Sequence, residues 1–378
     1  MHTDYGMRIT GIAAYASPRV VTNDEIAERL RLAMVQLDGR LTRERGQGLG
    51  ADERRKFMTN PRWIQKSIGF TERRFCQPGM GTIDLAVEAS RLLMNRTGVP
   101  PTSIGAILFG TVTSSYLYSP PDAALLQEAL GIPAWDGALP RETFGADVAL
   151  ACSTWGAALR IAYRFMDEVE HVLVIGADAM STAISWHDRA FACVLGNAGT
   201  ATLCSRVPPE QDWFGSERFF SWLDGSRADV ISTPVGGSKR PLETHEELDT
   251  YQHRLRMDGA RVREDMVPFI SGPGIDAVLT KARLNLADID HLVLHEANVV
   301  LNRGIVGNWQ QRGFRGAALD AGGRFGNTTS ASIPLALALN PDALRIGKTI
   351  ALVAFGGGYS MNTAIATIKH PFPVWANV

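Results

Sequence analysis

Residues 147–177, DVALACSTWGAALRIAYRFMDEVEHVLVIGA, contain a strand-like run, a turn of small residues, a helix-like run and a second strand-like run. The last seven residues, HVLVIGA, are continuously apolar, which is typical of a strand buried on both faces. The helix is indicated by apolar residues at helical spacing, namely Trp155, Ala158, Leu159, Ala162 and Phe165. This stretch therefore predicts a strand–turn–helix–strand unit.

The same alternation continues along the chain. Residues 104–113, 291–295 and 349–355 are further buried strand-like runs, and amphipathic segments such as residues 83–96 separate them. Strands that alternate with helices favour an α/β fold built from parallel crossovers.

Two of these patterns recur in the second half of the sequence. The helix and strand within 83–113 compare with those within 274–295, and HVLVIGADAMS (171–181) compares with TIALVAFGGGYS (349–360). Because both pairs occur in the same order, we expect a duplicated α/β half. Chance similarity between buried strands is the alternative explanation.

The composition narrows the class of protein. The 378 residues are 45% hydrophobic and 20% charged, which is typical of a globular chain and excludes disorder, collagen and coiled coil as descriptions of the whole. Lys and Arg number 38 against 39 for Asp and Glu, so a general nucleic-acid-binding protein is not expected.

The spacing of the cysteines and the length of the apolar runs indicate the cellular compartment in which the protein is expected. Four cysteines form no CxxC pair, so we expect neither a disulfide framework nor a zinc site, and a reducing cytoplasm fits this usage. No run of 18 apolar residues predicts a membrane span, and residues 1–21 lack the order of regions found in a signal peptide.

Residues 40–66 differ from the rest, with eight basic and three acidic residues. Such a segment is usually a solvated face. The alternative is a surface that meets phosphate or an acidic partner protein.

Cys152 lies at the strand-to-helix turn of the opening stretch. Unpaired N–H groups and the helix dipole at such a position favour the thiolate, which is the nucleophilic form of cysteine. Taken alone, a cysteine in an apolar run is more often a small buried hydrophobe.

Three other features have a functional and a structural interpretation. His295 ends the strand HLVLH, where ligands of α/β proteins tend to bind, although it is equally well explained as a structural histidine. Asn327 lies in a Gly-rich turn and by itself predicts only a turn former. Residues 355–359, FGGGY, form either a flexible turn or a loop that aims N–H groups at an oxyanion.

Other site types lack support. His187, His245 and His253 have no metal-ligand spacing, so no metal is expected. Neither a GxGxxG after a strand nor a GxSxG elbow occurs.

Taken in order, six segments resemble the ketosynthase III (beta-ketoacyl-acyl-carrier-protein synthase III) branch of the thiolase superfamily. The resemblance extends from about residue 7 to residue 369 and rests on the order and spacing of the whole set. The segments are GIAAYASPRVVTNDEIAERL (11–30), RWIQKSIGFTERR (62–74), DVALACSTWGAAL (147–159), HLVLHEAN (291–298), GNTTSASIPLAL (326–337) and FGGGYS (355–360).

The resemblance implies a thiolase-like α/β fold, in which duplicated βαβαβ halves form an α/β/α/β/α core. Residues 1–205 would form the half with the nucleophile, with an insertion at about 31–60, and residues 206–378 the half with His and Asn. Because the site needs both halves, we do not expect separable domains.

It also implies residue roles. Cys152 would accept the acyl group, with His295 and Asn327 as catalytic partners, and the N–H groups of Cys152 and Gly358 would form the oxyanion hole. The residues expected to bind substrate or coenzyme A are Trp63, Arg189, Asn298 and Phe355.

The implied activity is an acyltransferase that joins acyl-Cys152 to a malonyl or beta-ketoacyl thioester by decarboxylative Claisen-type condensation. No cofactor is expected; the substrates would be thioesters of coenzyme A or acyl carrier protein, and the enzyme a cytoplasmic homodimer. The alternatives are transfer of the acyl group to an amine, hydroxyl or second acyl chain without decarboxylation, and a non-catalytic partner subunit.

Four departures from the family pattern suggest a specialised rather than a housekeeping member, acting in secondary-metabolite or specialised lipid synthesis. Ser67 and Val300 replace basic residues, Glu296 stands in the histidine motif, and the 31–60 insertion is long. Arg303, Arg312 and Arg315 lie near Val300 and are candidates to replace the missing docking arginine.

Overall fold

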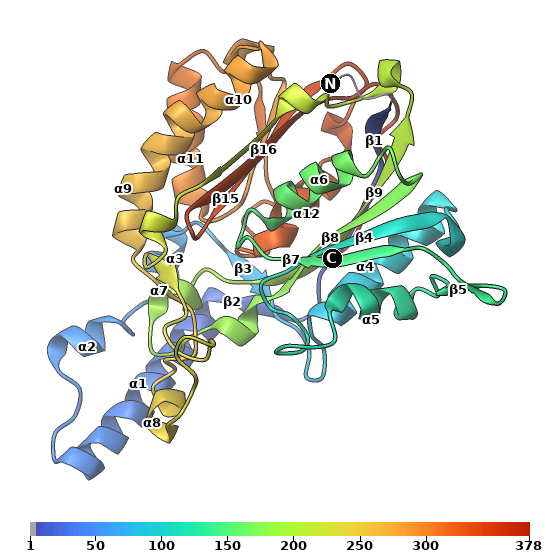
Figure 1. The fold of residues 1–378 in the computed structure, drawn as a ribbon. Coiled ribbons are helices and arrows are strands. Elements are labelled where there is room, and N and C mark those ends of the chain that lie inside the picture. Colours follow the sequence, from blue (N-terminus) through green and yellow to red (C-terminus); the bar gives the residue numbers. More distant parts are fainter. Residues whose placement is uncertain (1–4) are drawn as a thin grey trace.

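Two mixed β-sheets form the core of the computed structural model, which describes residues 5–378; the first four residues lie outside it. The first sheet has the order β17-β1-β9-β8-β4-β7 and the second β10-β16-β15-β13-β14 (Figure 1). The strands of the first sheet are β1 (Gly6–Tyr15), β4 (Ile104–Gly110), β7 (Phe144–Val148), β8 (His171–Ala179), β9 (Asn197–Val207) and β17 (Val374–Asn377). Those of the second are β10 (Phe219–Leu223), β13 (His291–Leu294), β14 (Ala317–Leu319), β15 (Thr349–Gly356) and β16 (Ser360–Thr367).

The two sheets repeat one topology. In the first, β4 is parallel to β7 and β8, and β9 is antiparallel to β8 and β1. In the second, β13 is parallel to β14 and β15, and β16 is antiparallel to β15 and β10. The strand pairs predicted to be repeats, β4 with β13 and β8 with β15, occupy matching places, so the predicted duplication is confirmed.

Two helices lie between the sheets. α6 (Thr154–Arg164) contacts β4 and β8 on one side and β15 and β16 on the other, while α12 (Ser332–Ala338) contacts β1, β9, β13 and β15. Alternation along β8 explains the layering: Val172 and Val174 pack on this central layer, and Leu173 and Ile175 face the outer helices.

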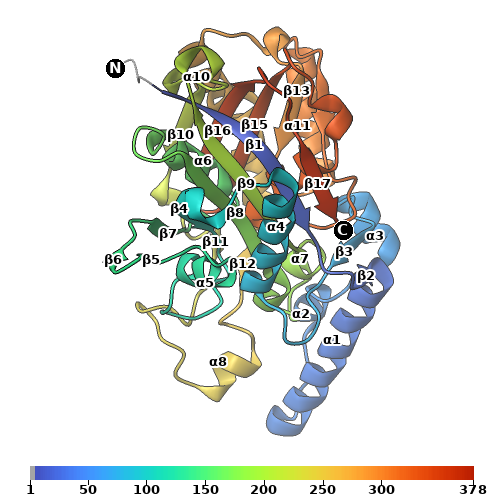
Figure 2. The same ribbon diagram turned by 90° about the vertical axis from the view of Figure 1, so that its right-hand side faces the viewer.

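Further helices cover the outer faces. α4 (Thr82–Thr97) and α5 (Asp122–Ala129) pack on the first sheet, and α9 (Gly259–Phe269), α10 (Ile275–Ala282) and α11 (Val299–Gln311) lie on the side of the second (Figure 1 and Figure 2). The result is the α/β/α/β/α arrangement predicted from the sequence. The C-terminal strand β17 pairs with β1 of the first sheet, and the division at residue 205 stays a prediction.

The segment predicted as an insertion forms the distal half of α1 (Asn23–Arg45), a loop, and α2 (Ala51–Arg55), which project from the core (Figure 1). Arg40 and Arg45 reach α8 (His245–Asp249), with ion pairs of 2.8 Å to Asp249 and 3.1 Å to Glu246. Part of the basic charge of residues 40–66 is therefore neutralised within the chain. Among residues 5–378, no helix has both the length and the apolar composition needed to span a membrane.

Gly156 and Gly39 lie in helices with different surroundings, so replacing each by alanine should change the free energy of unfolding in opposite directions. At Gly156 in α6, a Cβ would lie 2.9 Å from the Asn362 carbonyl oxygen of β16, so Gly156→Ala should lower the free energy of unfolding by about 1–3 kcal/mol. At Gly39 in α1, a Cβ would meet only Arg43 Nη1 at 3.6 Å, so Gly39→Ala should raise it by about 0.5–1 kcal/mol. Urea unfolding measures both; a shift in the same direction would contradict this packing.

Candidate active site

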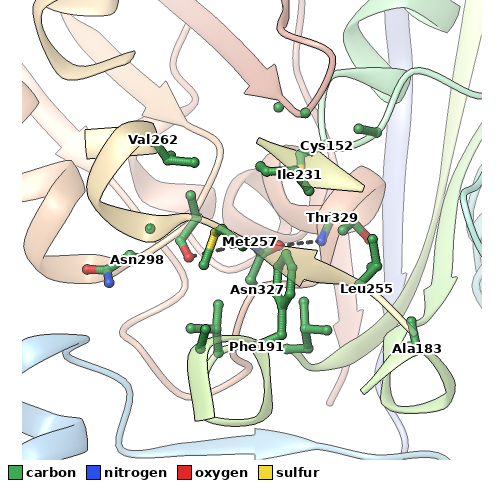
Figure 3. A pocket seen from close by; sticks show the side chains of 18 of the residues that line it. Cys152, Ala183, Phe191, Ile231, Leu255, Met257, Val262, Asn298, Asn327 and Thr329 are labelled. Atoms are coloured by element: carbon green, nitrogen blue, oxygen red, sulfur yellow. Dashed lines mark hydrogen bonds between the residues drawn. The ribbon is translucent and has the colours of Figure 1, made fainter. Parts of the chain in front are cut away.

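One cavity of about 1200 Å³ collects most of the predicted site residues (Figure 3). It lies where strands of both sheets end, so side chains from the two halves face each other across it. The predicted residues that line it are Trp63, Cys152, Arg189, His295, Asn298, Asn327 and Phe355. Their assigned roles stay predictions.

Cys152 lies in a constrained turn between β7 and α6. The preceding residue, Ala151, has φ 47°, a left-handed conformation that persists in a non-glycine residue only where the surroundings enforce it. Ser153, the N-cap residue of α6, lies with its Oγ 2.8 Å from Ser360 Oγ and accepts from Asn362 Nδ2 at 3.1 Å. The turn is thus fixed against β16 of the other half.

The resting acid–base state of Cys152 differs from the expectation of a thiolate. Burial, and secondarily the negative charge of Asp178, raise the pKa of the Cys152 thiol to about 12. Hydrogen bonds from the Asn327 side chain and from the N–H of Cys152 lower the pKa, but by less. The thiol is therefore protonated at neutral pH, because desolvation outweighs the helix terminus.

The glycine loop approaches the nucleophile turn closely. A Cβ on Gly356 would lie 2.7 Å from the backbone nitrogen of Cys152, so only glycine fits there. Gly356 and Gly357 line the cavity, whereas Gly358 is not one of its lining residues. The predicted oxyanion role of Gly358 is untested, and Gly356 and Gly357 are the loop residues at the cavity wall.

His295 follows β13 and is 1% exposed. Burial lowers the pKa of its imidazole to about 3, so the ring is neutral, and it packs edge-on against Phe355 with ring centroids 5.4 Å apart. Within the described residues, neither ring nitrogen has a hydrogen-bond partner. Buried polar groups are rarely left unpaired, so a ligand in the cavity is the natural partner.

The Asn327 side chain has a defined orientation. Its Oδ1 accepts from the Thr329 N–H at 2.9 Å, which assigns the amide oxygen to that side and leaves Nδ2 toward Cys152 (Figure 3). Nδ2 also lies 3.5 Å from the Ala297 carbonyl oxygen, at the limit of a hydrogen bond. The amide therefore presents N–H groups to the cavity.

Glu296 faces away from the cavity. Its carboxylate accepts from the Gly323 N–H at 3.2 Å, and its own N–H donates to Ser332 Oγ at 2.6 Å. Glu296 is not one of the cavity-lining residues. Burial, with a smaller contribution from the charge of Asp320, raises the pKa of the Glu296 carboxyl to about 7.

Trp63 and Arg189 meet at the mouth of the cavity. Trp63 lies on α3 (Pro61–Ser67) and Arg189 begins α7 (Arg189–Ala192), and the guanidinium carbon lies 4.3 Å from the centre of the indole ring. Asn298 caps α11 by accepting from the Leu301 N–H at 3.0 Å, which leaves its amide nitrogen for a ligand.

The sequence interpretation missed a two-stranded ribbon over the cavity. Ile231 of β11 (Ile231–Ser232) and Met257 of β12 (Arg256–Met257) line the cavity, with Ile231 drawn beside Cys152 (Figure 3). The Cβ of Ile231 lies 3.2 Å from where a Cβ on Gly357 would be. Strands of two residues have no detectable periodicity, so no signal in the sequence identifies this ribbon.

Two of the proposed replacement arginines are engaged locally. Arg312 forms a 2.5 Å ion pair with Asp276, and Arg315 donates to the carbonyl groups of Gln310 and Phe314. Ser67, at the position of a family basic residue, lines the cavity.

Comparison with known proteins identifies relatives of nearly the whole chain. Residues 146–219 match the family 3-Oxoacyl-[acyl-carrier-protein (ACP)] synthase III, and residues 279–368 match its C-terminal family. The beta-ketoacyl-[acyl-carrier-protein] synthase III of Alkalilimnicola ehrlichii is 31% identical over 362 residues, covering 95% of this chain and 98% of that protein.

Two further relatives extend the comparison. The acetoacetyl CoA synthase of Streptomyces sp. strain CL190 is 29% identical over 369 residues, covering 96% of this chain and 99% of that protein. The crystal structure of a beta-ketoacyl-[acyl carrier protein] synthase III from Thermus thermophilus matches with a TM-score of 0.73 and 27% identity, covering 95% and 98% of the two chains. The thiolase-like fold is thereby confirmed.

The raised pKa of Glu296 predicts a pH-dependent loss of stability. The folded carboxyl binds its proton up to about pH 7, whereas the ordinary pKa of a glutamate carboxyl is 4.5, so the contribution is fully present below pH 4.5 and is lost as pH rises through 7. Glu296→Gln mimics the protonated form. Relative to the wild type, its free energy of unfolding should increase by about 2–3 kcal/mol when the pH is raised from 5 to 8.5. Urea unfolding of both proteins at pH 5 and pH 8.5 measures this change. The same difference in stability at both pH values would contradict a raised pKa of the buried Glu296 carboxyl.

Proposed function

The chain belongs to the beta-ketoacyl-[acyl-carrier-protein] synthase III family, and from this premise we propose that it joins an acyl group on Cys152 to a malonyl thioester by decarboxylative condensation. One observation carries the proposal: Cys152 of the first half faces the neutral His295 and the oriented Asn327 amide of the second in one cavity.

In the first half-reaction, Cys152 Sγ attacks the carbonyl carbon of an acyl thioester. The new Sγ–C bond forms as the thioester C–S bond breaks, and the Cys152 proton ends on the departing thiol, which is consistent with a protonated resting cysteine. The Cys152 N–H and an N–H of the 356–358 loop stabilise the oxyanion. The close approach of Gly356 to Cys152 supports this arrangement.

In the second half-reaction, the malonyl thioester loses its carboxylate as carbon dioxide and leaves an enolate. His295 and Asn327 donate N–H hydrogen bonds to the enolate oxygen, for which a neutral imidazole is suited because it keeps an N–H without a competing charge. The enolate carbon attacks the acyl carbonyl, the Sγ–C bond breaks, and Cys152 leaves as a thiolate that regains a proton.

The substrate handle is proposed to be coenzyme A. A flat base between Trp63 and Arg189 would need about 7 Å, two van der Waals contacts, so the 4.3 Å pair must open to admit adenine. The amide nitrogen of Asn298 is proposed to donate to the pantetheine arm, because the Oδ1 of the same amide already accepts from the Leu301 N–H. Phe355 packs on His295 and supports the acyl end of the cavity.

Two observations favour coenzyme A over a carrier protein for the acceptor as well. Val300 replaces the docking arginine, and of the three candidate replacements Arg312 and Arg315 are held by local bonds, which leaves the exposed Arg303 alone. The relative from Streptomyces sp. strain CL190 is named for an acetoacetyl CoA product. With the four sequence departures, this supports a place in specialised lipid or secondary-metabolite synthesis.

The alternative of acyl transfer to an amine or hydroxyl needs a general base in the cavity. The Glu296 carboxylate bonds to the Gly323 N–H and does not line the cavity, and His295, which does line it, is a weak base because burial lowers its pKa to about 3. A non-catalytic partner subunit has no need for Cys152, His295 and Asn327 in one cavity. Decarboxylative condensation is therefore the function that the site supports best.

We further propose that the enzyme is a cytoplasmic homodimer, formed through the edge strand β7. Leu117 and Tyr118 are 78% and 86% exposed, and Phe144 on β7 is 44% exposed. Asp147 of β7 accepts from the N–H of Asp122, so the loop before Asp122 lies beside this edge. An exposed apolar edge of this kind is suited to pairing with a second copy.

Incubation with a panel of acyl-coenzyme A thioesters tests the proposed chemistry. Intact-protein mass spectrometry should detect one acyl group on the wild type and none on Cys152→Ala. Asn327→Ala should still load, while its rate of malonyl decarboxylation falls about 100- to 1000-fold with the loss of one oxyanion donor. Two results would contradict the proposal: acyl labelling that persists in Cys152→Ala, or no release of carbon dioxide when a malonyl thioester is added to the acylated enzyme.

Light scattering tests the dimer. Replacing Leu117 and Tyr118 by Glu should convert a dimer to a monomer at micromolar concentration, because two charges would be buried at the interface. Val35→Glu on the exposed face of α1, which is 53% exposed, is the matched control and should stay dimeric. A wild type that is monomeric throughout contradicts the proposed interface.

A further inference from the structure

Asp178 is a buried carboxylate that the mechanism above does not use. It lies near the end of β8, is 0% exposed, and is not one of the residues that line the cavity. Its Oδ1 accepts from Thr111 Oγ1 at 3.0 Å, the Val112 N–H at 2.8 Å and Thr113 Oγ1 at 3.1 Å. These donors belong to its own half of the molecule.

The other oxygen reaches across to the second half. Oδ2 accepts from the Ser330 N–H at 3.1 Å, from Ser330 Oγ at 2.5 Å, and from the Thr329 hydroxyl. Each carboxylate oxygen receives a backbone N–H, so the group serves as an acceptor on both sides. One side chain thus ties together two segments that are more than 200 residues apart.

The turn that Asp178 holds is strained. Thr329 has φ 48°, and a β-branched residue in the left-handed region is a conformational outlier that its surroundings must enforce. The N–H of this same Thr329 donates to Asn327 Oδ1 at 2.9 Å. The hydrogen bond that orients the Asn327 amide therefore depends on the turn that Asp178 fixes.

We propose that Asp178 is a positioning residue of this site: by holding the Thr329–Ser330 turn against the first half, it aims the Asn327 amide N–H groups at the substrate beside Cys152. The inference rests on the proposed condensation, in which those N–H groups stabilise the enolate. Asp178 contacts the turn and not the reacting atoms, so it acts through Asn327.

The position of Asp178 has a second, measurable consequence. Its charge raises the pKa of the Cys152 thiol. Asp178→Asn keeps the side-chain volume and removes the charge. In either orientation of the new amide, its NH2 group would face a backbone N–H, that of Val112 or that of Ser330, and one hydrogen bond would be lost. The loosened turn weakens the Asn327 hydrogen bond that lowers the pKa of the thiol, but the charge of Asp178 has the larger effect, so the thiol should ionise at lower pH.

The test compares Asp178→Asn with Asp212→Asn. Asp212 is a matched control because it also accepts several hydrogen bonds, from the N–H groups of Met7, Phe214 and Gly215 and from Tyr163, and it does not line the cavity. For Asp178→Asn, the pH midpoint of Cys152 alkylation, read by peptide mass spectrometry, should move down and acyl loading should persist. The kcat of malonyl decarboxylation should fall about 100-fold, as expected for a misplaced donor, with KM changed less than about 3-fold.

Asp212→Asn should leave the alkylation midpoint and the ratio of loading to decarboxylation unchanged. A general folding defect lowers loading and decarboxylation together, so parallel loss in Asp178→Asn, or unchanged decarboxylation, overturns the proposal. Failure of the proposed function is distinct, because a wild type that never loads an acyl group still reports the alkylation midpoint.

A smaller change guards against a variant that fails to fold. Thr329→Val keeps the branched shape and removes the hydroxyl bond to Asp178, and should lower decarboxylation about 10-fold, whereas Thr329→Ser should restore it. Equal rates for the valine and serine variants would contradict a role for the Asp178 bond.

Discussion

The contact between the two duplicated halves at the ends of their central strands is the constraint on which the site depends. Asp178 ties its own half to Thr329 and Ser330 of the other, and Ser153 lies within hydrogen-bond distance of Ser360. α6 and α12 pack between the sheets, so the turns that precede them are brought to this seam. A nucleophile from one half therefore faces hydrogen-bond donors from the other.

Burial at this seam sets the charge state of the resting enzyme. A desolvated thiol holds its proton and a desolvated imidazole stays neutral, so Cys152 and His295 coexist as uncharged groups. This suits a reaction in which the negative charge arrives with the substrate: neutral donors are in place before the enolate forms. The strained backbone at Ala151 and Thr329, on matching turns of the two halves, is the structural cost of this arrangement.

Much of this was predictable from the sequence, for physical reasons. The buried strands at 171–181 and 349–360 have a strong apolar signal, so their repetition and the α/β class were detectable. The ordered motifs also located Cys152, His295 and Asn327, which line one cavity. The local sequence pattern could not predict the protonation state of Cys152, because desolvation of its thiol depends on which distant segments of the chain pack against it.

Other features depend on contacts between distant segments. Asp178 was not predicted from the sequence, because its hydrogen-bond partners at 111–113 and 329–330 are defined only by the fold. Glu296 was expected beside the chemistry, yet the backbone turns its carboxylate toward Gly323. The choice among the three glycines of 356–358 depends on a close approach to Cys152 that sequence order does not encode.

The central claim is that an acyl group on Cys152 meets an acceptor held by both His295 and Asn327. A crystal structure of the acyl-enzyme with a non-reactive malonyl thioester analogue tests it most directly. We expect the acyl carbon bonded to Cys152 Sγ and the acceptor carbonyl oxygen about 2.7–3.1 Å from nitrogen atoms of both His295 and Asn327. An acyl group on another residue, or an acceptor oxygen that reaches neither side chain, would contradict it.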